Sequence, residues 1–317
     1  MYEPYETNTE IVRHKFTPGQ SPFRNCAPDS ITTWPTEIPA SLRFGGFTKP
    51  DGISDTSPGR ATNPNYDGFL PVKAYFMGSR TPEGPAEWYL VTPLLNGSNL
   101  NTLAKRLSTS AQIKSFREID ALYRPAFNRL LKSMGSLHAA GFCHDDIKPA
   151  NVFVQDVSHW VLGDLGNVRE VSHPYHSSKI WKDNAQLEDC RANDVMRALQ
   201  SYLKFIQSSA GNEDEFNAAF YEGDEPLSRL FWWTLGDAPG MSAEEFRRRS
   251  DVEGPNTRSE MVHKPTRPHT FISLFSQRLA NKRAADHALM TRMDERSTRW
   301  FGLVWLFGVP EPHACGV

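Results

Sequence analysis

The stretch Gly141-Phe-Cys-His-Asp-Asp-Ile-Lys-Pro-Ala-Asn-Val-Phe-Val154, followed ten residues later by Asp164-Leu-Gly, decides how this sequence is interpreted. Asp146, Lys148, Asn151 and Asp164 stand there in one ordered spacing. A carboxylate can orient an attacking hydroxyl, a lysine can stabilise developing charge, and amide and carboxylate oxygens can hold magnesium on phosphates. These four residues supply the side chains that a phosphoryl transfer needs.

The pattern His-x-Asp-x-Lys-Pro-x-Asn, then a β-rich run and Asp-x-Gly, resembles the catalytic loop and metal-binding turn of eukaryotic-type protein kinases. In the alternative interpretation these residues only cap turns on solvated loops, which does not explain their common spacing. The resemblance covers about residues 68–250 and implies an α+β, two-lobed protein-kinase-like fold. Its N-terminal lobe is small and β-rich, and its C-terminal lobe is mainly helical.

The resemblance also implies a role for each of the four residues. Asp146 is expected to orient a Ser or Thr hydroxyl, and Lys148 to stabilise charge. Asn151 and Asp164 are the expected ligands of Mg²⁺, which binds together with ATP. Lys148 favours Ser/Thr over Tyr as the acceptor by the same resemblance.

Residues 87–91 are rich in strand formers and precede Thr92-Pro-Leu-Leu-Asn-Gly. This order resembles the last strand of the small lobe and the hinge that reads adenine through backbone groups. It makes Thr92 the gatekeeper residue, Pro93 a residue that can offer only its carbonyl, and Leu95 the source of an N–H and a carbonyl. An ordinary strand with a glycine turn explains Gly97 equally well.

The first 66 residues contain scattered proline and glycine and predict no helix, with a long loop over residues 45–65. A kinase carries here a Gly-x-Gly-x-x-Gly loop, a strand lysine that grips the phosphates and a helix glutamate that holds this lysine. None of the three can be identified. Lys73 is interpreted as a solvent-facing strand residue, because the next strand follows too soon for a helix. Lys15 and Lys49 are poor candidates.

Residues 119–140 predict a long helix that precedes the catalytic loop. Apolar residues recur at helical spacing, namely Phe127, Leu130, Leu131, Met134 and Leu137. Gly141 is expected to end this helix in the left-handed conformation, and Pro125 to lie in its first turn or to kink it.

Two features depart from the family pattern. Asp145 stands where many kinases have an arginine that binds a phosphate, and an acid there would repel phosphate. Both the Ala-Pro-Glu sequence and its arginine partner, expected near Met241, are missing.

Two other features support the large lobe. Asp194 resembles the helix residue that braces the catalytic loop, and Ser242 with Glu245 forms a predicted capping box.

The composition of the 317 residues is that of a soluble globular protein, with 39% hydrophobic residues and a net charge of -2. This charge gives no indication of a nucleic-acid partner. The four cysteines are far apart and predict reduced thiols. No secretory signal is evident, and the run 300–307 is too short to span a bilayer, so we expect an intracellular protein, cytoplasmic or nuclear.

We expect a divergent small lobe over residues 1–95, a kinase-like large lobe over 96–250, and a linker with a C-terminal helical extension over 251–317. The favoured function is a protein serine/threonine kinase that uses ATP and Mg²⁺ on a protein substrate. The alternative is a pseudokinase, a binding or scaffold module that has lost catalysis. A small-molecule kinase is a third possibility, against which Lys148-Pro149 argues.

Overall fold

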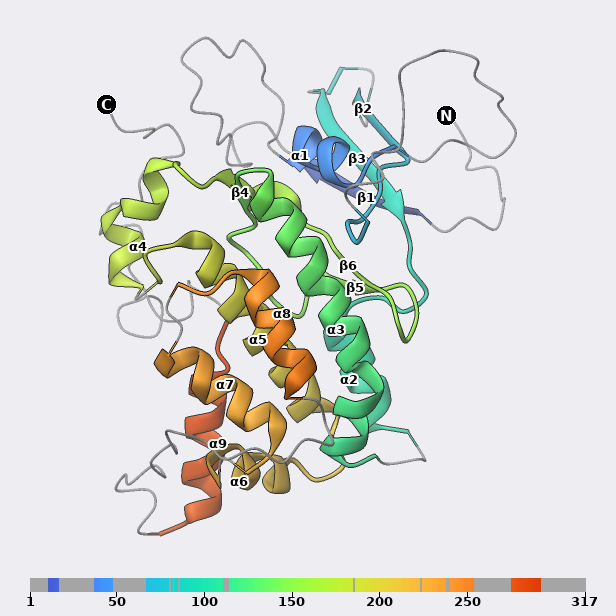
Figure 1. Ribbon diagram of the computed structural model, residues 1–317. Coiled ribbons are helices and arrows are strands. Elements are labelled where there is room, and N and C mark those ends of the chain that lie inside the picture. Colours follow the sequence, from blue (N-terminus) through green and yellow to red (C-terminus); the bar gives the residue numbers. More distant parts are fainter. Residues whose placement is uncertain are drawn as a thin grey trace.

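The computed structural model describes residues 11–16, 37–47, 67–79, 81, 83–84, 86–110, 114–184, 186–222, 224–237, 240–253 and 275–291. A small sheet and one helix lie at one end of the molecule, next to a larger lobe made mainly of helices (Figure 1). This arrangement confirms the predicted α+β, two-lobed fold. Residues 48–65 of the loop predicted at 45–65, the part of the predicted linker after residue 253 and the run 300–307 lie outside the described residues.

The small lobe is built on three antiparallel strands in the order β1-β3-β2. They are β1 (Ile11–Phe16), β2 (Ala74–Gly78) and β3 (Glu87–Pro93). The backbone of Lys15 lies opposite Tyr89 on the central strand. Lys73 directly precedes β2, its backbone N–H donates to the Val91 carbonyl on β3 at 2.8 Å, and its side chain is partly exposed.

A helix packs against this sheet. Helix α1 (Glu37–Phe44) places Ile38 in a cluster with Val72 and Leu90. The prediction that the first 66 residues hold no helix is therefore wrong. Pro39 lies in the first turn of α1, where its missing N–H costs no hydrogen bond, so this proline does not prevent a helix.

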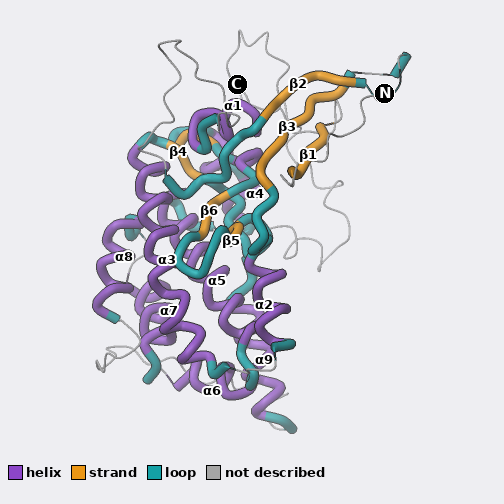
Figure 2. Tube along the Cα trace, turned by 90° about the vertical axis from the view of Figure 1, so that its right-hand side faces the viewer, coloured by secondary structure: helices purple, strands orange, loops and turns teal. Residues whose placement is uncertain are grey.

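The chain leaves the sheet through the predicted hinge and enters α2 (Leu100–Ser108), whose N-cap Asn99 accepts from the Thr102 N–H. Figure 2 shows the sheet at one side of the molecule and the helical lobe below it. The long helix α3 (Phe116–Ala139) follows and starts at Ser115 with a capping box. Pro125 lies well inside α3, not in its first turn. Gly141 has φ +85°, which confirms the predicted left-handed helix end.

The large lobe contains further helices after α3. They are α4 (Lys179–Asp183), α5 (Cys190–Ser209), α6 (Glu213–Glu222), α7 (Pro226–Asp237), α8 (Ala243–Val252) and α9 (Gln277–Ala288). The predicted capping box of Ser242 and Glu245 is present at the start of α8. Met241 is buried in the main core, where a charged side chain would have needed a partner.

Short strands carry the candidate catalytic loop between these helices. β4 (Phe142–Cys143) pairs with β7 (Arg169–Glu170), and β5 (Val152–Val154) pairs with β6 (Trp160–Leu162). The 3-10 helices η2 (Leu165–Asn167) and η3 (Pro174–Ser177) flank β7. The loop that contains Asp146 therefore starts and ends on strands that are each paired with a neighbour.

The prediction of reduced thiols is wrong for two of the four cysteines. Cys143 on β4 and Cys190 at the start of α5 form a disulfide with their Cα atoms 6.0 Å apart. Both side chains are buried. The sequence separation of 47 residues concealed this pairing, because the two residues meet only after α5 has packed beside β4. Cys26 and Cys315 lie outside the described residues.

Candidate active site

Asp146 is held through one of its two carboxylate oxygens. Its Oδ2 accepts from Lys148 Nζ at 2.7 Å, from Asn167 Nδ2 at 3.2 Å and from Asn151 Nδ2 at 3.3 Å. Among the described residues no donor contacts Oδ1. The side chain is 23% exposed. The three donors fix the direction of the carboxylate and leave one oxygen to accept a proton or a hydrogen bond from a ligand hydroxyl.

Asn151 and Asp164 offer oxygen atoms that suit a hard cation. The Asn151 amide nitrogen also donates to the Asp146 carbonyl at 2.9 Å, so its amide oxygen is left as a possible ligand. Asn151 O accepts from Gly163 N at 3.0 Å, which brings the two segments together. Asp164 has φ +54°, and its carboxylate has no hydrogen-bond or ion-pair partner among the described residues. These observations fit the residue types that bind Mg²⁺.

Glu37 is a residue of this site that the sequence did not reveal. It is buried at the start of α1, and a Cβ atom added at Gly166 would lie 3.7 Å from Glu37 Cβ. Burial, with a smaller effect from the charge of Asp164, raises the pKa of Glu37 to about 8. Among the residues whose side chains the structure describes, no cation pairs with Glu37. Its carboxyl is therefore held mainly protonated at neutral pH in this structure.

The predicted hinge residues lie at the end of β3. Thr92 is buried, and its hydroxyl has no hydrogen-bond partner among the described residues. Pro93 and Leu95 are half-buried. The Leu95 carbonyl accepts from Ser98 N at 2.7 Å in the turn that leads to α2. The position of these residues between the two lobes is compatible with contact to a nucleotide base.

Asp194 on α5 braces the catalytic loop through hydrogen bonds to its backbone, as the sequence predicted. Its Oδ2 accepts from His144 N at 2.6 Å, and its Oδ1 accepts from Asp145 N at 3.0 Å. His138 Nε2 lies 3.1 Å from Oδ2. Burial raises the pKa of this carboxyl, but the hydrogen bonds and charges of His138 and His144 outweigh burial and lower it overall. A charged, fully buried Asp194 therefore holds two consecutive backbone N–H groups of the loop.

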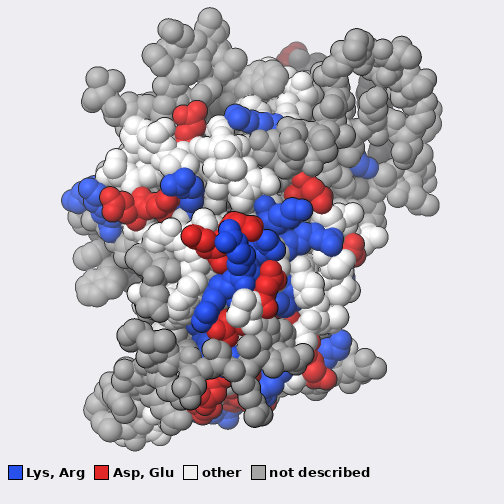
Figure 3. Space-filling view, viewed as in Figure 1, with Lys and Arg blue, Asp and Glu red and all other residues white. Residues whose placement is uncertain are grey.

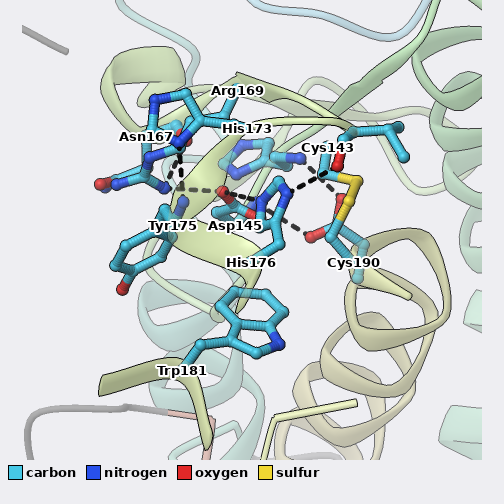
Figure 4. A network of polar contacts seen from close by, with 12 residues as sticks. Cys143, Asp145, Asn167, Arg169, His173, Tyr175, His176, Trp181 and Cys190 are labelled. Carbon is cyan, nitrogen blue, oxygen red and sulfur yellow. Dashed lines mark hydrogen bonds and ion pairs between the residues drawn. A yellow bond between two sulfur atoms is a disulfide. The ribbon is translucent and has the colours of Figure 1, made fainter. Parts of the chain in front are cut away.

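Asp145 is buried and already paired with cations. Its Oδ2 accepts from Arg169 Nη1 at 2.6 Å and lies 2.9 Å from His176 Nε2 (Figure 4). Its carbonyl accepts from Arg197 Nη1 at 2.7 Å. Its backbone is in the left-handed region, with φ +62°. We expected Asp145 to act as an acid that repels phosphate, whereas the structure places it inside the lobe in an ion-pair network.

The ionisation of Asp145 and His176 is linked. Burial raises the pKa of Asp145, and the hydrogen bond from His176, which acts to lower this pKa, does not offset the effect of burial. Burial lowers the pKa of His176, but the hydrogen bond to Asp145 and the Asp145 charge outweigh it, so that pKa is raised overall. Arg169 also stacks on the ring of Tyr175, with its guanidinium carbon 4.0 Å from the ring centre. The segment after β7 is therefore tied to the loop without any phosphate.

The structure brings the predicted residues Asp146, Lys148 and Asn151 into mutual contact and places Asp164 on the adjoining turn. Sequence reasoning did not assign a supporting role to five residues, which are Glu37, Asn167, Arg169, His176 and Arg197. Asn167 follows directly on Asp-x-Gly and could have been found there as one more amide donor. The other four meet the loop only through tertiary packing.

Comparison with known proteins agrees with this geometry. Residues 77–196 match the family model described as "Protein kinase domain". The matched segment runs from β2 to the first turns of α5 and includes Asp146, Asn151 and Asp164. This chain has a protein kinase-like domain.

The individual relatives that match this chain are named as kinases. The kinase-like chain is 26% identical over 95 residues to "eIF-2-alpha kinase GCN2" of Schizosaccharomyces pombe, which covers 30% of this chain and 6% of that protein. It is 28% identical over 124 residues to "Eukaryotic translation initiation factor 2-alpha kinase PK4" of Plasmodium falciparum, covering 36% and 11%. It is 28% identical over 107 residues to "Serine/threonine-protein kinase PknA" of Mycobacterium tuberculosis, covering 34% and 23%. The chain thus spans less than a quarter of the length of each of these relatives.

The surface of the kinase-like chain is mixed in charge on the face that Figure 3 shows, where basic and acidic side chains lie side by side. On α8, for example, Arg247 pairs with Glu244 and with Asp251.

Among the described helices, none combines the length and the apolar character that a bilayer crossing requires.

Proposed function

We propose that this protein is a serine/threonine kinase that transfers the γ-phosphoryl group of ATP to a hydroxyl of a protein substrate. The observation that carries the proposal is the one-sided hold on Asp146. Three donors occupy Oδ2, while Oδ1 has no partner among the described residues. A carboxylate held in this way can accept the hydrogen bond of a Ser or Thr hydroxyl and direct its lone pair.

The other residues have roles that follow from their chemistry. When bound, magnesium and ATP supply the phosphoryl group and neutralise its charge. Asn151 and Asp164 would hold the metal through oxygen atoms, and the Lys148 ammonium would stabilise charge that develops near Asp146. Thr92 would line the nucleotide site, and Pro93 and Leu95 would present backbone groups to the base.

A pseudokinase is the second candidate, and Glu37 is the observation that favours it. In a kinase small lobe the helix glutamate pairs with the lysine that grips ATP, as the family resemblance implies. Glu37 is buried, has a raised pKa and lacks a described cationic partner. A small-molecule kinase is less well supported, because Lys148-Pro149 follows the protein-kinase pattern.

Turnover of radiolabelled ATP tests the proposal. The parent protein should label a protein substrate in the presence of Mg²⁺, and Asp146→Ala should lower this rate by about 10²- to 10⁴-fold. The substrate panel should include the eIF-2-alpha after which two of the relatives are named. No labelling by the parent across the panel would favour the pseudokinase, and full activity in Asp146→Ala would refute the role of Asp146.

Nucleotide binding separates the two candidates further. Mg²⁺ with ATP should raise the melting temperature of the parent protein, because a ligand that binds the folded state stabilises it. Asp164→Asn should lose most of this increase, since an amide is a poorer ligand than a carboxylate for a hard cation. An equal increase in both proteins would show that Asp164 does not hold the metal.

A further inference from the structure

A cavity of about 710 Å³ lies beside the catalytic loop. Its walls come from four separate parts of the chain. The loop contributes Lys148, Pro149 and Ala150, and α2 and α5 contribute Asn101 and Lys204. The remaining wall is formed by residues of α9 and the turn that follows it, which lie outside the segment that matches the kinase family.

Basic side chains outnumber acidic ones in the lining of this cavity, and they are Lys148, Lys204, Arg283 and His287. Asp286 is the acidic residue among the described lining residues, and its Oδ1 accepts from Lys204 Nζ at 2.7 Å. Arg283 is exposed and has no acidic partner among the described residues. Because Lys204 neutralises Asp286, the guanidinium of Arg283 remains as a positive charge that a ligand can pair with.

Lys148 connects this cavity to the catalytic group. It lines the cavity and also donates to Asp146 Oδ2 at 2.7 Å. A peptide that presents a Ser or Thr hydroxyl to Asp146 would therefore bring neighbouring residues over the cavity, since an extended chain advances only about 3.3 Å per residue. The charge of the cavity would then act on residues close to the acceptor in sequence.

We propose that this cavity binds acidic side chains of the substrate peptide, with Arg283 as the principal contact. The cavity would make the enzyme prefer Ser or Thr residues with Asp, Glu or a phosphorylated residue close by. α9 would thereby determine specificity for a reaction carried out by residues of the kinase-like domain. The choice of substrate rests on the proposed kinase function, but binding of the peptide does not require phosphoryl transfer.

Direct binding tests the proposal on the full chain. Fluorescein-labelled peptides with one Ser are compared by anisotropy, and the flanking residues are either Asp and Glu or their neutral counterparts Asn and Gln. The acidic peptide should bind about three- to ten-fold more tightly, as expected for one or two exposed charge pairs. This preference should decrease at high salt, because salt screens exposed charges.

Two variants of α9 show whether the cavity is responsible. Arg283→Gln should remove most of the preference for the acidic peptide. Arg278→Gln is the matched control, because Arg278 lies on the same helix but pairs with Asp214 and lines a different cavity. The control should keep the preference, and melting curves should show that both exposed substitutions leave the protein folded.

Several results would overturn the proposal. Equal affinity of the parent for acidic and neutral peptides would do so, as would no measurable binding of the acidic peptide. An equal loss of preference in Arg283→Gln and Arg278→Gln would show a general charge effect. A peptide with phosphoserine beside the acceptor tests whether phosphate binds as carboxylate does. A parent that keeps the acidic preference but transfers no phosphoryl group would favour the pseudokinase and leave the binding site intact.

Discussion

Asp145 and Asp146 are neighbours in the sequence, but their surroundings differ completely. The Asp145 side chain is 1% exposed and paired with Arg169 and His176, whereas the Asp146 side chain is 23% exposed and has one oxygen without a described partner. The backbone of Asp145 is left-handed, and the first acid lies inside the lobe while the next is partly exposed. The inner acid holds the loop, and the outer acid is available for a ligand.

This difference shows how a loop can be both rigid and reactive. A buried carboxylate is stable only if cations and hydrogen bonds compensate its loss of water, and Asp145 has such partners. A carboxylate that acts on a substrate must instead keep a free oxygen and a fixed direction. We therefore expect changes below the loop to affect stability and changes on its surface to affect chemistry.

The largest effect on stability is expected from Arg169→Ala. This variant leaves Asp145 buried without its closest cation, which typically costs about 3–5 kcal/mol of unfolding free energy. Urea unfolding followed by circular dichroism measures the change. Arg191→Ala is the matched control, because its ion pair with Asp189 is exposed and should contribute less than about 1 kcal/mol. Similar losses in the two variants would contradict the structural role of the Asp145 network.

Removing the disulfide should have the next largest effect. The double variant Cys143→Ala with Cys190→Ala should have a free energy of unfolding about 2–4 kcal/mol lower than that of the parent, because the bond restricts the unfolded chain. The same unfolding experiment with and without a reductant checks this. The parent should lose stability in the reductant and the double variant should not. A parent that is equally stable with and without the reductant would show that the bond contributes nothing.

Glu37→Gln should change how stability depends on pH. The folded state raises the pKa of Glu37 from 4.5 to about 8, so between these values the folded protein keeps a proton that the unfolded chain releases. Parent stability therefore falls as pH rises through this window, by up to about 1.4 kcal/mol per pH unit for one proton. The variant lacks this loss, so its free energy of unfolding relative to that of the parent should increase from pH 5 to pH 8. Melting curves without metal or nucleotide test this, and a constant difference would refute it.

The smallest effect is expected from phosphorylation of the segment after β7. Arg169 already pairs with Asp145, so no free arginine of this network awaits a phosphate on Ser172, Ser177 or Ser178. Removing phosphate with a phosphatase, confirmed by mass spectrometry, should leave kinase activity unchanged. A loss of activity that follows dephosphorylation of these serines would show that the segment is phosphate-controlled after all.

The sequence predicted the site best where its residues are close together in the chain. Asp146, Lys148 and Asn151 lie within six residues, and local geometry brings them into contact. The ends of α3 and α8 were also predictable, because Gly141 and the Ser242 capping box act over one turn of helix. The α+β fold followed from the kinase-like order of these features.

The rest could not be found because it depends on packing between distant segments. Cys143 and Cys190 meet only when α5 lies beside β4, and Asp145 receives Arg169 from a later strand. Helix α1 could have been anticipated from Ile38, Leu42 and the proline in its first turn. The closeness of Glu37 to Asp164 has no counterpart in the sequence pattern.

The most direct measurement compares Asp145→Asn with Asp146→Asn, recording both the melting temperature and the rate of phosphoryl transfer at a temperature where both variants are folded. Asp146→Asn should keep a melting temperature close to the parent's and lose about 10²- to 10⁴-fold in rate. Asp145→Asn should melt at a lower temperature and keep most of the rate. A rate loss in Asp145→Asn that equals or exceeds that in Asp146→Asn would contradict the assignment of chemistry to the outer acid and support to the inner one.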